Sequence, residues 1–171
     1  LGSGSTLSII STSSMSVTNT INIGDNPVCV AVDKDGEVYV LCAGFYNDFG
    51  NPNDDTPAKI KIINASTEQI VDSILIGGHS FSMDIGKILE RGYVCADTSV
   101  ISINTKTNKS IGNFVNKNFY AVSIDESSGD VYCADAKNFS TNGSFSVYTS
   151  AGTFRKSSDV GIIPTAFAFV R

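Results

Sequence analysis

Short apolar stretches that alternate with polar turn residues run through the whole chain. Residues 28–33 and 38–43 are two such stretches, rich in valine, and they flank the turn sequence DKDG at residues 33–36. β-Branched residues favour strands, and neither stretch is long enough for a helix. Aspartate bonds its own backbone in tight turns and glycine accepts a positive φ, so this segment predicts a β-hairpin.

The hairpin pattern returns twice, in residues 81–97 (FSMDIGKILERGYVCAD) and 119–135 (FYAVSIDESSGDVYCAD). Each copy is followed by two more strand-like stretches, joined by a turn that Asn, Thr or Ser opens. Four strands in a unit of about 40–55 residues is the period of a β-propeller blade. We therefore predict an all-β chain that forms a partial β-propeller, with about four blades of four antiparallel strands. A β-sandwich is the alternative.

The pattern also divides the chain, which we treat as one propeller segment over residues 1–171. We expect a partial blade at residues 6–23, blades at 26–76, 80–114 and 119–160, and a closing strand at 165–170. The residues expected to pack between blades are Val30, Val32, Val40, Ile60, Ile62, Met83, Ile85, Val122, Ile124, Phe145 and Val147. An open ring leaves an apolar blade face uncovered at each end. We therefore expect self-association through these faces, or contact with a missing N-terminal half.

Charge and composition exclude some partners. The formal net charge is −5 and only 12 residues are Lys or Arg, which argues against a nucleic-acid surface. No apolar run is long enough for a transmembrane segment. The four cysteines form no CxxC pair, and His79 is the one histidine, so no zinc site is expected. Three of the cysteines recur before alanine in a predicted buried strand, which is typical of packed thiols. A disulfide between Cys29 and Cys42 remains open.

Several of these motifs resemble a known family. Asn26-Pro27, the turn at 33–36, residues 38–40 and the stretch 60–67 resemble the YVTN-type propeller repeat. Residues 152–167 are similar to the C-terminus of YncE-like (DUF5074-type) β-propellers of Bacteroidetes. Blade two departs from the pattern, with Ser80 in place of proline. The resemblance implies export to the periplasm or the outer-membrane surface, often as a lipoprotein, and in some relatives corrinoid capture beside an outer-membrane transporter.

Long connections all fall on one face of the predicted propeller. Second-to-third and fourth-to-first connections emerge on the same face, and the insertions at residues 44–58 and 136–143 belong to it. Long loops on a rigid scaffold often carry function, and ligand sites commonly combine aromatic rings with a few polar groups. The candidate ligand-binding residues on this face are Phe45, Tyr46, Asn47, Asp48, Phe49, His79, Asn116, Asn138 and Phe139.

Structural roles compete with these assignments. The aromatic residues could pin the long loop to its own blade. The Asn and Asp residues at 47–55 offer oxygen ligands for Ca²⁺, although they match no EF-hand spacing and a solvated turn is favoured. His79 has the chemistry of a general base but no evident partner. Asp97 and Asp135 end equivalent strands and are expected to cap turns.

The predicted function is a non-catalytic module that binds a small molecule or a surface or transport protein, with no catalytic residue, resident metal or other cofactor. A lactonase-like or other propeller hydrolase is the alternative. Hydrolases of that kind gather metal ligands around the central channel. Here Asp84 is the one carboxylate inside a predicted first strand.

Overall fold

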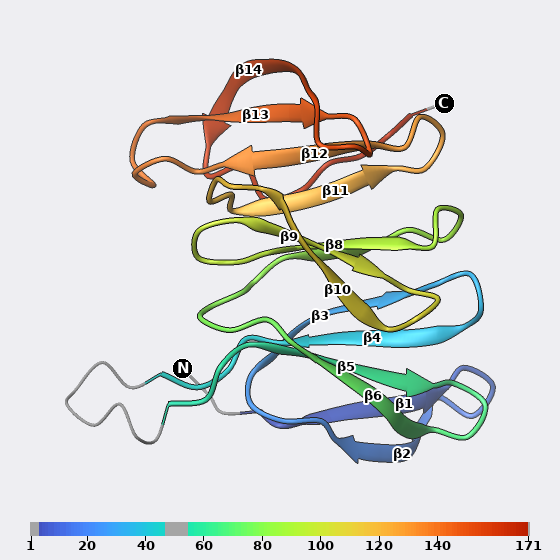
Figure 1. The fold of residues 1–171 in the computed structure, drawn as a ribbon. Coiled ribbons are helices and arrows are strands. Elements are labelled where there is room, and N and C mark those ends of the chain that lie inside the picture. The colour runs from blue at the N-terminus through green and yellow to red at the C-terminus, as the bar shows by residue number, and fades with distance from the viewer. Residues whose placement is uncertain (1–3, 47–54, 171) are drawn as a thin grey trace.

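The computed structural model describes residues 4–46 and 55–170, which fold into strands, turns and loops without a helix (Figure 1). Accordingly, no described segment is a helix long and apolar enough to cross a membrane. The strands are β1 (Thr6–Ser11), β2 (Ser16–Asn22), β3 (Pro27–Val32), β4 (Glu37–Cys42), β5 (Lys59–Asn64), β6 (Gln69–Leu75), β7 (Met83–Ile85), β8 (Arg91–Cys95), β9 (Val100–Asn104), β10 (Lys109–Val115), β11 (Ala121–Asp125), β12 (Asp130–Asp135), β13 (Asn142–Tyr148) and β14 (Phe154–Ile162).

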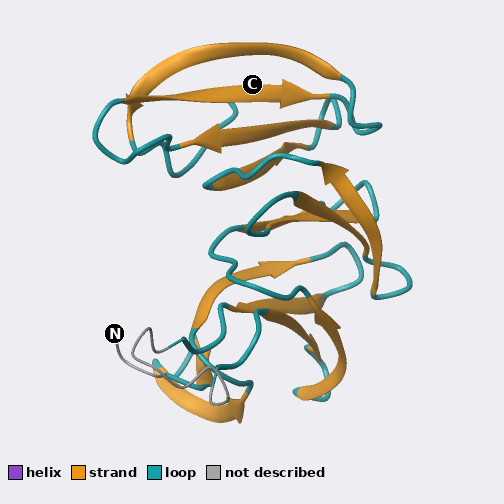
Figure 2. Cartoon of the chain, turned by 60° about the vertical axis from the view of Figure 1, so that its left-hand side comes forward, coloured by secondary structure: helices purple, strands orange, loops and turns teal. Residues whose placement is uncertain are grey.

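Three four-stranded antiparallel sheets confirm the predicted blades. Blade one is β3-β4-β5-β6, blade two is β7-β8-β9-β10 and blade three is β11-β12-β13-β14, while β1 and β2 form a separate hairpin. Figure 2 shows that the sheets follow one another along an arc. The first strands of successive blades lie side by side, since β3 contacts β7 and β7 contacts β11.

The predicted turns form through the expected side chains. Oδ1 of Asp33 accepts hydrogen bonds from the backbone N–H groups of Asp35 and Glu37, both at 2.9 Å. Asn64 accepts in the same way from Ser66 and Thr67, both at 3.0 Å. Local turn chemistry therefore reverses the chain as the sequence predicts.

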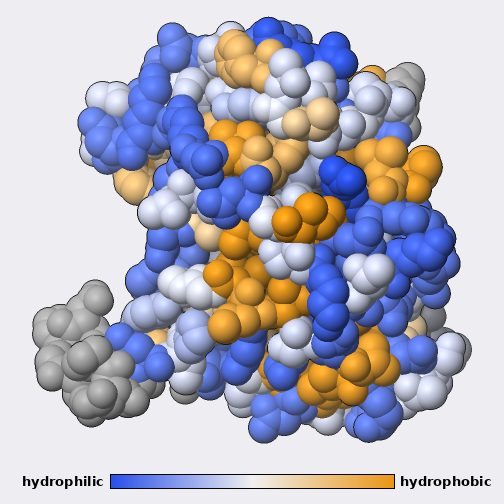
Figure 3. All heavy atoms as spheres, in the orientation of Figure 1, coloured by the Kyte–Doolittle hydropathy of each residue, from blue (hydrophilic) through white to orange (hydrophobic). Residues whose placement is uncertain are grey.

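Apolar side chains fill the space between neighbouring sheets. The junction of blades one and two buries Tyr39, Leu41, Ile60, Ile62, Ile74, Met83, Ile85, Val94 and Ile103. The junction of blades two and three buries Tyr93, Cys95, Val100, Phe119, Val122, Ile124, Val131, Cys133 and Tyr148. On the surface seen in Figure 3, apolar side chains gather at mid-height, where blades one and two adjoin.

Two of the predicted core residues are exposed instead. Val30 is 54% and Val32 is 40% exposed. Both lie on the face of blade one that looks toward the β1–β2 hairpin, and this hairpin covers Val40 and Ile63 in the outer part of that face but leaves β3 open. Phe145 is half-buried, and the other predicted core residues are buried.

The predicted closing strand is wrong. Residues 164–170 join no β-ladder, because no strand of the described chain lies beside them to pair with. The segment is nevertheless packed, since the rings of Phe167 and Phe169 lie 5.6 and 5.0 Å from the ring of Tyr132 on β12.

Cys29 and Cys42 are free thiols on opposite sides of blade one. The Cys29 thiol donates to the backbone oxygen of Met83 in blade two, and the Cys42 thiol donates to that of Ile23 beside the hairpin. The disulfide that the sequence left open is therefore not formed.

Candidate functional site

A cleft of about 190 Å³ opens between blades two and three on the face of the long connections, which lies at the left of Figure 1. We call this the loop face, and the opposite side, with its short reversals, the turn face. The cleft is lined by His79, Ser80, Phe81, Cys95, Ala96, Asp97, Asn118, Phe119, Tyr120 and Phe139.

A histidine and a carboxylate meet at one side of the cleft. Nδ1 of His79 lies 3.4 Å from Oδ1 of Asp97, and the backbone N–H of His79 donates to Oδ2 at 3.1 Å. The side-chain amide of Asn118 donates to the backbone oxygen of Asp97 at 2.6 Å. Gly78 permits this approach, because it has a φ of 50° and a Cβ there would collide with Oδ2 of Asp97.

Tyr46 restrains the imidazole. Its ring centroid lies 3.6 Å from that of His79, with the planes 32° apart. Its hydroxyl donates to the backbone oxygen of Gly78 at 2.6 Å. Burial raises the pKa of Tyr46, and the carboxylates of Asp97 and Asp55 add to that effect. The phenol therefore stays protonated at neutral pH and remains a donor.

Exposed aromatic rings form the other side. Phe81 is 58%, Tyr120 37% and Phe139 54% exposed, and the rings of Tyr120 and Phe139 meet edge to face at 5.4 Å. Phe81 and Tyr120 also line a second groove of about 350 Å³ along the first strands of the three blades. The rings of Phe81 and Tyr120 therefore lie between the cleft and the groove on the inner side of the arc of blades.

The structure brings together only some of the predicted residues. His79 and Phe139 line the cleft, with Tyr46 behind His79. The backbone of Phe45 pairs with Thr56 and closes the base of the long loop. Asn138 caps a turn, accepting from Ser140 and Thr141, and Asn116 accepts from Asn113. Asn47, Asp48 and Phe49 lie outside the described residues, as does most of the proposed Ca²⁺ loop.

Sequence reasoning missed four members of the site. It treated Asp97 as a turn cap and found no partner for His79, yet the two side chains meet across 18 residues of chain. Asp135 does cap a turn, accepting from the N–H of Lys137 at 2.8 Å. Phe81, Asn118 and Tyr120 were also missed. Phe81 and Tyr120 hold the same position, just before the first strand of their blades. An alignment of the repeats would therefore have shown an aromatic residue recurring there.

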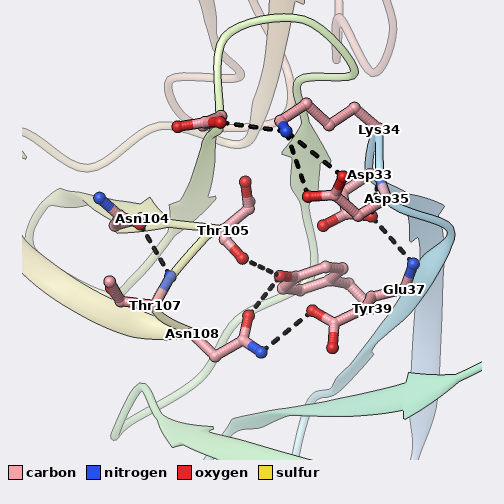
Figure 4. Close-up of polar contacts among 10 residues, drawn as sticks. Asp33, Lys34, Asp35, Glu37, Tyr39, Asn104, Thr105, Thr107 and Asn108 are labelled. Carbon is pink, nitrogen blue, oxygen red and sulfur yellow. Dashed lines mark hydrogen bonds and ion pairs between the residues drawn. The ribbon is translucent and has the colours of Figure 1, made fainter.

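The turn face between blades one and two carries a closed polar network instead (Figure 4). The buried Tyr39 hydroxyl shares its proton between the backbone oxygen of Thr105, at 3.0 Å, and the side-chain oxygen of Asn108. The amide of Asn108 donates to Glu37 at 3.1 Å. These groups satisfy one another, so the network holds the two blades together and offers no free ligand site.

Comparison with known proteins identifies the fold. No family model matches the chain, and no curated protein matches it. Among solved structures, hydrazine synthase of Kuenenia stuttgartiensis aligns with a TM-score of 0.76 and 16% identity, over 92% of this chain and 44% of that one. The fold is that of β-propeller blades.

Two further structures agree. A quinonprotein alcohol dehydrogenase-like protein from Bacteroides thetaiotaomicron gives a TM-score of 0.56 and 14% identity, over 85% of this chain and 36% of that one. A functionally unknown protein from Desulfotomaculum acetoxidans gives a TM-score of 0.61 and 15% identity, over 93% of this chain and 50% of that one. The chain spans half or less of each of these proteins, and such low identity establishes the fold alone.

Proposed function

We propose that this chain is a non-catalytic binding module whose ligand occupies the loop-face cleft between blades two and three. The observation that carries the proposal is the meeting of exposed aromatic rings with a polar group of His79, Asp97 and Asn118 in one cleft. Exposed rings contribute apolar area and stacking, while fixed polar groups orient the ligand.

The size of the cleft favours a small ligand. Drug-sized ligands occupy pockets of about 300–1,000 Å³. At about 190 Å³ the cleft fits a monosaccharide-sized molecule, with an apolar face for Phe139 and Tyr120 and hydroxyl groups for Asp97 and Asn118. A corrinoid, which the family resemblance suggests, would rest on the rim, because its macrocycle exceeds the cleft.

The hydrolase alternative has less support in the described residues. The hydroxyl next to His79, on Ser80, is buried and donates to the backbone oxygen of Cys95, so it is not presented to a substrate. Within residues 4–46 and 55–170, no three His, Cys, Asp or Glu side chains come together as a metal-ligand set.

Calorimetric titration with a panel of hexoses and with cobalamin tests the proposal. Phe139→Ala should weaken binding of the responding ligand at least about tenfold, because truncating an aromatic anchor removes stacking area. Phe154→Ala is the matched control, since Phe154 is 55% exposed but lies on β14 outside the cleft. Binding that Phe139→Ala leaves unchanged, or no binding by any member of the panel, would contradict the proposal.

The setting of the module is proposed on the sequence resemblance alone. We place it outside the cytoplasm, in the periplasm or on the outer-membrane surface, where it would hand a ligand to a surface or transport protein. Fractionation of cells that carry the native gene tests this, with detection by an antibody against the chain. Recovery in the cytoplasmic fraction would contradict it.

A further inference from the structure

The junctions of blades one and two and of blades two and three are built in the same way. Tyr39, Tyr93 and Tyr132 hold the same position on the second strand of their blades. Their partners on the first strand, which are Ala31, Asp84 and Ser123, are also equivalent to one another. Tyr39 and Tyr93 are fully buried against the following blade. There they meet two apolar side chains of its first strand, which are Met83 and Ile85 at one junction and Val122 and Ile124 at the other.

The third tyrosine is covered by the C-terminal segment. Counted from its proline, the sequence PTAFAF at 164–169 matches PVCVAV at 27–32, so Phe167 and Phe169 correspond to Val30 and Val32. These two phenylalanines lie on Tyr132, as Met83 and Ile85 lie on Tyr39. Residues 164–169 therefore take the place of the first strand of a further blade.

The outward side of this segment is small and open. Ala166 and Ala168 are exposed, and they correspond to Cys29 and Ala31. In blade one, Cys29 and Ala31 pack against the cluster that contains Met83 and Ile85. An apolar cavity of about 330 Å³ adjoins the segment, between Tyr132, Phe145 and Ala168. We call this end of the molecule the alanine end.

The opposite end has the complementary surface. Val28, Val30 and Val32 are 40–54% exposed in a row on β3. Val30 and Val32 correspond to Met83 and Ile85, the residues that receive Cys29 and Ala31. The β1–β2 hairpin covers the outer part of this face and leaves the inner part free. We call this the valine end.

We propose that a second copy of this chain docks its valine end on the alanine end of the first. Val30 and Val32 of one copy then face Ala166 and Ala168 of the other, which repeats the contact that blades one and two already make. The hairpin of the second copy lies over the apolar cavity beside residues 164–169. The two faces differ, so the contact is heterologous. The chain covers 44% and 50% of two solved chains of the same fold, so two copies that make the contact twice should close a ring. This association is independent of the ligand in the cleft.

Sedimentation velocity from micromolar to millimolar concentration tests the proposal. The chain should sediment as a dimer that dissociates on dilution. Val30→Asp and Ala168→Asp should each raise the dissociation constant at least about tenfold, because each buries an unpaired carboxylate in the contact. Both positions are exposed in the single chain, so circular dichroism should stay unchanged. Val71→Asp, 50% exposed on β6, is the control that should leave association intact.

Mixing the two variants distinguishes this geometry from others. Each variant alone damages both contacts of its dimer, whereas a mixed pair keeps one contact between two unaltered ends. The mixture should therefore associate more tightly than either variant by itself. The proposal is overturned by a chain that stays monomeric, by a dimer that either substitution leaves intact, or by a mixture that associates no better than its components.

Discussion

Tyr39 and Tyr93 occupy equivalent positions, and both rings are fully buried between two blades. Their hydroxyl groups differ in their hydrogen bonds. Tyr39 donates into the turn of blade two, at Thr105 and Asn108. The hydroxyl of Tyr93 is the one buried side-chain polar atom of the described residues that makes no hydrogen bond. Burial raises the pKa of both tyrosines. The ring position is therefore fixed by packing, while the fate of the hydroxyl depends on the neighbouring blade.

The neighbouring turn accounts for the difference. The turn TKTN at 105–108 places Asn108 beside Tyr39, with a φ of 54°. The corresponding turn of blade three, SAG at 150–152, is one residue shorter, since Thr149 and Thr153 pair across it, and its last residue, Gly152, has a φ of 84° and offers no side chain. Arg91 donates to the backbone oxygen of Ser150 in that turn at 3.4 Å, which links the blades, and its charge near Tyr93 partly opposes the rise in pKa that burial causes.

The second junction also has hydrogen bonds at its inner side. The hydroxyl oxygen of Ser82 accepts from the N–H of Val122 at 3.1 Å, and Oδ2 of Asp84 accepts from that of Ile124 at 2.8 Å. Blades two and three are thus tied along their first strands, and also at the turn face, where the carboxylate of Glu126 accepts from the backbone N–H groups of Lys87 and Ile88. The cleft lies between these blades at the loop face. Blades one and two are tied at the turn face by the Tyr39 network, and along their first strands by the Cys29 thiol, which donates to the backbone oxygen of Met83.

The largest effect is expected from the aliphatic packing of the first junction. Ile62→Ala should lower the free energy of unfolding by about 2–5 kcal/mol, because it opens a cavity at a fully buried site. Ile111→Ala, at a 52% exposed site on β10, should change it by less than about 0.5 kcal/mol. Urea denaturation measures both. Equal costs at the two sites would show that the blades do not pack as described.

Tyr39→Phe should cost about 1–3 kcal/mol, because it leaves the buried acceptors at Thr105 and Asn108 without their donor. The ring is retained, so the loss reports the hydroxyl alone. A thermal or urea midpoint equal to that of the unsubstituted chain would mean that the network in Figure 4 contributes nothing to stability.

Gly152→Asn tests whether the turn residue determines the difference. Asparagine tolerates the left-handed backbone and would offer Tyr93 an oxygen, although its Cβ would lie 3.1 Å from the backbone oxygen of Phe114. A double-mutant cycle with Tyr93→Phe cancels that crowding and should give a coupling of about 1 kcal/mol. Zero coupling would assign the difference to something other than residue 152.

Tyr93→Phe alone should have the smallest effect. The substitution removes a buried hydroxyl that has no partner, so the free energy of unfolding should change by less than about 0.5 kcal/mol or rise slightly. The difference between the stability losses of Tyr39→Phe and Tyr93→Phe compares the two hydroxyl groups directly. A loss as large as that of Tyr39→Phe would place a hydrogen bond at Tyr93.

The sequence by itself determined the elements and their order. Alternating apolar residues and turns opened by Asp33 and Asn64 act over a few residues, so their pattern predicts the hairpins wherever they stand. The threefold recurrence predicted the blades, and the long connections predicted a loop face. These features are local, which is why they could be read without the structure.

Only the tertiary structure decided which sides of those strands are covered. Val30 and Met83 hold the same position in the repeat, yet Val30 is exposed and Met83 is buried, because among the described residues a four-stranded blade precedes Met83 and the two-stranded β1–β2 hairpin precedes Val30. His79 meets Asp97 because the connection into blade two passes the end of β8. Contacts between blades join residues far apart in sequence. The local pattern that builds each blade therefore does not specify which side chains of the neighbouring blade will cover it.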